Sequence, residues 1–193
     1  MMPFIKQITI ILLILIPFLG STQNRYAVKS HEIAIDGTSN VMSWSAEVEQ
    51  VSGHFDIAIE DGKITSIENV RIRVDTRSIE GSEGRRMNNK IYESLETGDH
   101  PFINYELRDI LSLYENPGTA RITSRGVLTV AGVSRVIELE PVGRVLRNGD
   151  IEFTGTQTID MTDYNIDPPT AMFGVLRTGK EVELSYRVVV SPE

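Results

Sequence analysis

Residues 151–161 read IEFTGTQTIDM, and this stretch decides the class of fold. Its odd-numbered positions are apolar or glycine apart from Gln157, whereas the positions between them are Glu, Thr or Asp. A period of two is that of a β-strand, in which successive side chains point to opposite faces. The stretch therefore predicts a strand with one buried face and one hydrated face. Such strands are typical of antiparallel sheets, because parallel sheets are covered on both faces.

Shorter runs with the same alternation recur along the chain, at residues 54–60, 70–75, 103–108, 121–126, 137–140 and 182–187. Turn-forming residues separate these runs at Asp61-Gly62, 116–118 and 148–150, and Asp36-Gly37 predicts a further turn. The sequence thus predicts an all-β domain of about eight strands, folded as a sandwich or as a closed barrel. A closed barrel of this size is either filled by its own side chains or able to hold one ligand.

One segment departs from the strand pattern. Residues 83–95 read EGRRMNNKIYESL, and Met87, Ile91 and Leu95 recur in it at every fourth position. This spacing predicts a short helix with a narrow apolar stripe, which ends near Thr97-Gly98.

The first residues have the layout of a secretory signal peptide. Lys6 precedes the apolar run 8–19, ITIILLILIPFL, which small residues follow. The run is shorter than the ~20 residues that a membrane span needs. We expect residues 1–23 to be a cleaved signal peptide and residues 24–193 to form the barrel domain, with no stable membrane span after cleavage; a retained anchor is the alternative. The expected location is periplasmic or extracellular, in a bacterial envelope.

The composition argues against several classes of function. The chain has 19 basic and 27 acidic residues, a net charge of −8, and no cysteine. We expect no nucleic acid partner, because the basic surface that phosphates require is missing. Thiolate chemistry has no residue to carry it, the usual hydrolase and nucleotide-binding motifs are absent, and His31, His54 and His100 fall on separate predicted elements. We therefore expect no cofactor, no metal site and no catalytic residue.

Several short motifs, and the order in which they follow one another, resemble those of the YceI-like, lipocalin-like family. They are GTSNV at 37–41 before Trp44, HPFINY at 100–105, GVLTVAGVS at 126–134 and MTDYNIDPP at 161–169. The resemblance implies an extended eight-stranded antiparallel lipocalin-like barrel with a long apolar pore. It also implies an exported protein that binds a polyisoprenoid or a related long-chain amphiphile.

The strand alternation suggests which residues line such a pore. Trp44 is either a core aromatic at one end of the sheet or a ligand contact, and Gln157 is an amide on the buried face that needs a hydrogen-bond partner. A long apolar chain needs volume and apolar lining rather than a motif. The candidate lining residues are Trp44, Phe55, Ile57, Ile72, Ile103, Tyr105, Leu128, Ile137, Phe153, Gln157, Ile159, Met161 and Leu184, with Tyr164 and Phe173 near a mouth.

The leading hypothesis is a non-enzymatic protein that binds, transports or sequesters a polyisoprenoid or other long-chain lipid in the cell envelope. The main alternative is a filled barrel that acts as an envelope stress or protein-interaction module without a lipid. A hydrolase or isomerase would need acid and base groups on the buried faces, where the strands offer almost none. The oligomeric state stays open, with a homodimer as one option.

Overall fold

The structure is a computed structural model, which describes residues 24–171 and 175–193. Its strands are β1 Asn24–Ser39, β2 Ser43–Val48, β3 Val51–Glu60, β4 Lys63–Asp75, β5 Ile79–Gly81, β6 Phe102–Asn116, β7 Thr119–Val130, β8 Val133–Leu139, β9 Val142–Val145, β10 Ile151–Asp160, β11 Thr170–Ala171 and β12 Leu176–Pro192. The helices are α1 Arg85–Ser94 and the short 3₁₀ helices η1 Thr76–Ser78 and η2 Met161–Tyr164.

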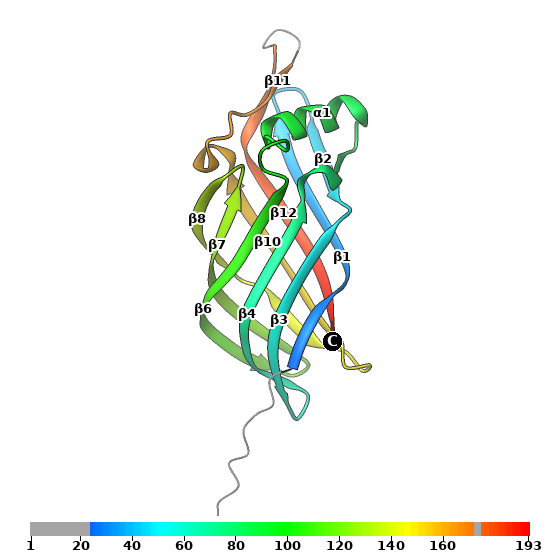
Figure 1. The fold of residues 1–193 in the computed structure, drawn as a ribbon, viewed down its shortest axis with the longest axis vertical. Coiled ribbons are helices and arrows are strands. Elements are labelled where there is room, and N and C mark those ends of the chain that lie inside the picture. Colours follow the sequence, from blue (N-terminus) through cyan, green and yellow to red (C-terminus); the bar gives the residue numbers. More distant parts are fainter. Residues whose placement is uncertain (1–23, 172–174) are drawn as a thin grey trace, which may run out of the picture.

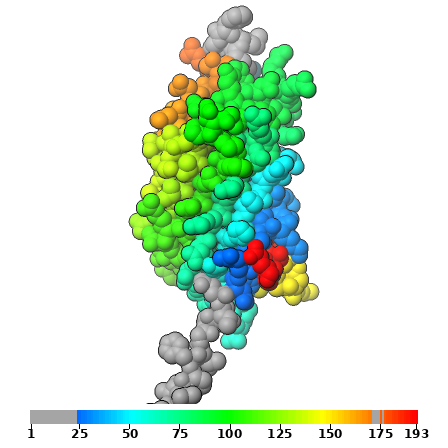
Figure 2. Space-filling model, in the orientation of Figure 1, coloured from blue at the N-terminus to red at the C-terminus, as the bar shows by residue number. Residues whose placement is uncertain are grey.

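The strands form a closed eight-stranded antiparallel barrel, which decides between the two architectures that the alternation left open. Its strand order is β12, β10, β9, β7, β6, β4, β3 and β1, and β1 then pairs with β12 to close the ring (Figure 1). Closure removes the unpaired edges that an open sheet would present to other chains. In the space-filling view the barrel is elongated, with α1 near one end and the C-terminus near the other (Figure 2).

The wall is not hydrogen-bonded over its full height. Within the described ranges, β10 pairs with β9 only at Ile151–Thr154, and its later residues pair with β12 alone. β8 pairs with β7, and among the described residues no pairing joins β8 to β10. η2 contacts both β8 and β12, and thus lies beside this gap.

The predicted turn at Asp36-Gly37 is wrong, because both residues lie inside β1. Gly37 pairs with Trp44 of β2, and the indole ring fills the space where a Cβ on Gly37 would lie. Glycine is therefore needed here for a close approach, while the turn itself follows, closed by the bond from the Ser39 amide to the Met42 carbonyl at 2.8 Å.

The end of the long strand also differs from the prediction. Met161 continues the alternation in the sequence but begins η2 in the structure. The Asp160 side chain accepts a bond from the Thr162 amide at 3.0 Å, which caps the 3₁₀ turn and ends the strand.

The predicted helix is confirmed as α1, within residues 83–95. Its apolar residues Met87 and Ile91 pack with Leu95 against a cluster formed by Ala46, Val48 and Ile79. α1 is thereby fixed to β2 and β5 at one end of the barrel (Figure 1). Among the described residues, no helix has the length and apolar composition that crossing a membrane requires.

Candidate functional site

The barrel encloses an apolar cavity of about 310 Å³. Small-molecule sites span about 300–1,000 Å³, so the volume suits a ligand. The alternation of the strands explains the lining, because inward positions on one strand after another are Ile, Val, Leu or Phe. Examples from β4 and β6 are Val70, Ile72, Ile103 and Leu107.

None of the residues that line the cavity in the described part of the chain is Asp, Glu, Lys, Arg or His. Burying an ionised group without a counter-charge costs on the order of several kcal/mol. The cavity is therefore suited to uncharged, largely apolar guests.

The two ends of the cavity differ. At the end where α1 lies, Ile91, Ser94 and Leu95 line it together with Met161 and Tyr164 from the η2 turn. Toward the other end, the rings of Phe55 and Phe153 stack with centroids 5.7 Å apart. Both rings belong to the main cluster of buried hydrophobic residues, of which Ile57, Ile64 and Ile151 do not line the cavity.

Two tyrosines lie flat against the wall because glycines on the neighbouring strands leave room for their rings. The Tyr105 ring from β6 covers Gly126 of β7, and the Tyr186 ring from β12 covers Gly155 of β10. A Cβ on either glycine would overlap the ring. Without these glycines the rings would project into the cavity and reduce its volume.

Burial changes the acidity of these tyrosines. Burial, with a smaller contribution from the nearby Tyr105, raises the pKa of Tyr186 to about 12. Burial also raises the pKa of Tyr105, which the Ser124 hydroxyl partly offsets. Both hydroxyls therefore stay protonated at neutral pH and can donate a hydrogen bond.

Most of the residues expected to line the pore do line the cavity. They are Trp44, Phe55, Ile72, Ile103, Tyr105, Leu128, Ile137, Phe153, Gln157, Ile159, Met161, Tyr164 and Leu184. The Gln157 amide donates to the neighbouring Thr158 carbonyl at 3.0 Å. Contact between these residues and a ligand stays a prediction.

Two candidates fall outside this set. Ile57 shares the inward face of β3 with Phe55, but it is fully buried in the core and does not line the cavity. The alternation fixes the side of the strand and not the depth at which the cavity ends. Phe173 lies outside the described residues.

The structure adds lining residues that the candidate set lacks. Ser124 and Tyr186 lie on inward positions of strands that the alternation already identified, so the signal was present in the sequence. Ile91 and Leu95 belong to the predicted helix. Their role could not be predicted, because the spacing that gives a helix does not say where it packs.

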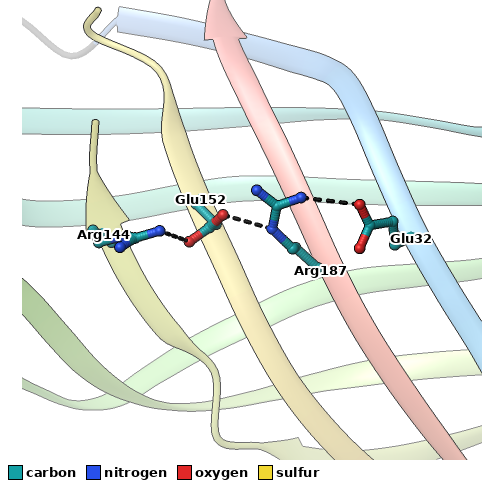
Figure 3. Close-up of polar contacts among 4 residues, drawn as sticks. All are labelled: Glu32, Arg144, Glu152 and Arg187. Carbon is teal, nitrogen blue, oxygen red and sulfur yellow. Dashed lines mark hydrogen bonds and ion pairs between the residues drawn. The ribbon is translucent and has the colours of Figure 1, made fainter. Parts of the chain in front are cut away.

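A charged cluster on the wall joins four strands near the point where the barrel closes. Arg187 of β12 lies between Glu152 of β10 and Glu32 of β1, with Nε 2.7 Å and Nη1 3.0 Å from the respective carboxylates, and Arg144 of β9 binds the other Glu152 oxygen (Figure 3). Burial raises the pKa of Glu152, but the hydrogen bonds from the two arginines outweigh it and hold that pKa below its usual value.

Several solved structures of other proteins have the same fold. BcnA from Burkholderia cenocepacia superposes with a TM-score of 0.60 at 14% identity, over 83% of this chain and 96% of BcnA. A polyisoprenoid binding domain from Saccharophagus degradans, implicated in plant cell wall breakdown, gives 0.65 at 12% identity, over 89% of this chain and all of that domain. The YCEI protein of Campylobacter jejuni superposes with a TM-score of 0.57 at 17% identity, over 77% of this chain and 84% of the Campylobacter chain.

These low identities establish the fold alone, and no curated protein matches the sequence. The family assignment comes from the sequence model of the YceI-like domain, which matches residues 27–190. Since that match spans most of the chain, the protein belongs to the YceI-like domain family.

Proposed function

We propose that this protein binds a polyisoprenoid or another long-chain amphiphilic lipid, and that it carries or sequesters this lipid without catalysing a reaction. The observation that carries the proposal is the cavity of about 310 Å³, whose lining in the described chain is apolar and free of charged residues. Each CH₂ group moved from water into such a site contributes about 0.8 kcal/mol. A long hydrocarbon chain therefore binds tightly there without a specific polar motif.

Family membership supports the same class of ligand. The Saccharophagus degradans neighbour is described as a polyisoprenoid binding domain, and its fold is shared by this chain. The alternative, a barrel filled by its own side chains, is less well supported because the lumen between the Phe55–Phe153 stack and α1 is open.

The proposed location is the cell envelope, either periplasmic or extracellular. Its support is the apolar run 8–19 behind Lys6, which has the layout of a signal peptide. Residues 1–23 would then be removed and residues 24–193 would form the exported domain.

The test is the lipid content of the protein purified from bacterial cells, measured by solvent extraction and mass spectrometry. Two adjacent residues of β12 supply the variants: Leu184 lines the cavity, while Glu183 is exposed on the outer face. Leu184→Trp places an indole in the lumen and should remove most of the lipid. Glu183→Trp adds the same group outside and should leave the lipid content unchanged.

Circular dichroism confirms that both variants keep the barrel before their lipid contents are compared. The proposal fails if the wild-type protein contains no long-chain lipid and takes none up when it is incubated with detergent-dispersed prenyl alcohols.

A further inference from the structure

Two tyrosine hydroxyls in the wall of the cavity have no hydrogen-bond partner. The oxygens of Tyr105 and Tyr186 are both buried, and among the residues that the structure describes neither makes a hydrogen bond of good geometry. The group nearest to the Tyr105 hydroxyl is the Ser124 hydroxyl, which lowers the pKa of Tyr105. Buried polar groups in native proteins are almost always hydrogen-bonded, so an unpaired donor at a binding site points to a ligand group. The two strands that carry them, β6 and β12, occupy opposite positions in the ring.

The rings place both hydroxyls on one side of the lumen. Tyr105 reaches over Gly126 of β7, and Tyr186 reaches over Gly155 of β10. Because glycine has no side chain, a tilt of either ring away from the wall breaks no side-chain packing at that position. Such a tilt moves the hydroxyl toward a chain that lies in the lumen.

The other polar groups on this side are already hydrogen-bonded. The Ser124 hydroxyl donates to the Leu139 carbonyl at 3.3 Å, and the Gln157 amide donates to the Thr158 carbonyl at 3.0 Å. Ser124 and Gln157 lie on β7 and β10, the strands that carry the two glycines. The tyrosines are thus the two donors of this polar patch that make no hydrogen bond of good geometry, and the second N–H of the Gln157 amide lies beside them on β10.

The charge of the lining limits what the patch can accept. The described lining contains no cation to balance a phosphate or a carboxylate. A buried anion would therefore be strongly disfavoured, whereas a neutral oxygen loses little when it exchanges water for a tyrosine hydroxyl.

We propose that the lipid carries a neutral hydrogen-bond acceptor, such as a ketone, ester or hydroxyl oxygen, which lies inside the barrel and binds Tyr105 and Tyr186. This inference rests on the proposed function, because it requires a chain in the lumen. It narrows the ligand class to lipids whose buried part is uncharged and excludes those whose phosphate must enter the cavity.

The test compares matched probes that displace the neutral dye N-phenyl-1-naphthylamine from the delipidated protein. Undecan-6-one and undecane differ only in a carbonyl, and decyl phosphate is decan-1-ol with a charged phosphate group added at its hydroxyl. Wild-type protein should prefer the ketone over the alkane by about tenfold, as expected for two hydrogen bonds of ordinary net strength. It should also prefer the alcohol over the phosphate.

Tyr105→Phe combined with Tyr186→Phe should abolish the preference for the ketone while undecane binds as before. Tyr114, which is exposed on β6, supplies the control variant Tyr114→Phe, which should behave as wild type. If the double variant does not fold, Tyr105→Phe and Tyr186→Phe are tested separately, and each should weaken the preference for the ketone. An unchanged ketone preference without the two hydroxyls, or phosphate binding equal to that of the alcohol, would overturn the inference. Failure of every probe to displace the dye would instead count against lipid binding itself.

Discussion

Gly37 shows how a single residue controls the shape of the cavity. Its missing side chain lets Trp44 lie against β1, where the indole lines the cavity and donates to the Thr38 carbonyl at 3.3 Å. Gly37→Ala should force the indole off this position and destabilise the protein by about 1–3 kcal/mol, the usual cost of overpacking. Trp44 is the only tryptophan, so its fluorescence emission reports the shift directly, and urea unfolding gives the change in stability.

Gly98→Ala is the matched control. A Cβ on Gly98 meets no atom of the described residues within 4 Å, so this variant should keep both the wild-type emission spectrum and the wild-type unfolding curve. Equal spectra for the two variants would mean that Gly37 does not set the position of the ring.

Single residues also show how far the sequence could predict the site. Alternation places Phe55, Ile72 and Leu184 on inward faces, and the structure finds them around the cavity. It could not separate Ile57, which is buried in the core, from these residues, because depth along the barrel depends on how the strands are staggered. It also could not show that the Tyr105 ring lies against a neighbouring strand, since that contact depends on Gly126 of another strand.

At the scale of elements, η2 depends on a carboxylate. Asp160 accepts bonds from the Thr162 amide and hydroxyl, at 3.0 and 2.6 Å, and from Lys180 at 2.6 Å. The Lys180 bond, followed by those from Thr162, lowers the pKa of Asp160 to about 2. The stabilisation from this folded-state shift is fully present above the usual aspartate value of 3.8 and is lost as the pH falls through about 2.

Asp160→Asn removes the charge and keeps an acceptor for the cap. The free energy of unfolding of the wild type should therefore fall more steeply than that of the variant between about pH 4 and about pH 2. Urea unfolding at a series of pH values in this window measures the free energy of unfolding of both proteins. The other carboxylates contribute equally to the two, so the difference between the curves reports Asp160. Parallel curves would show that Asp160 contributes nothing to acid sensitivity.

Elements were easier to predict than their contacts. The spacing of Met87, Ile91 and Leu95 predicts α1 correctly, because the apolar stripe of a helix is a local property. The same spacing says nothing about the cavity that Ile91 helps to close. The turn predicted at Asp36-Gly37 failed for a related reason, since the glycine serves a partner seven residues away rather than a local bend.

At the scale of the whole molecule, the cluster of Glu152, Arg187, Arg144 and Glu32 holds the strands around the closure. Glu152 is the buried member, and a glutamine there can accept from only one of the two arginines and carries no charge, so Glu152→Gln should cost about 2 kcal/mol. The control is Glu106→Gln, in the exposed pair with Arg71 at 3.6 Å, which should change the stability by less than about 0.5 kcal/mol. Urea unfolding at neutral pH compares the two, and equal losses would show that the cluster acts as an ordinary surface pair.

Cavity and barrel are also linked energetically, because a guest that binds only the folded barrel must stabilise it. At a free ligand concentration about a hundred times the Kd, the gain is about 2.7 kcal/mol, which raises the Tm of a domain of this size by roughly 5–10 °C. Scanning calorimetry should therefore show a higher Tm for the delipidated wild type and for Glu183→Trp when undecan-6-one is added. The Tm of Leu184→Trp should not change, because the new indole occupies its lumen. A shift of equal size in all three proteins would place the binding site outside the barrel.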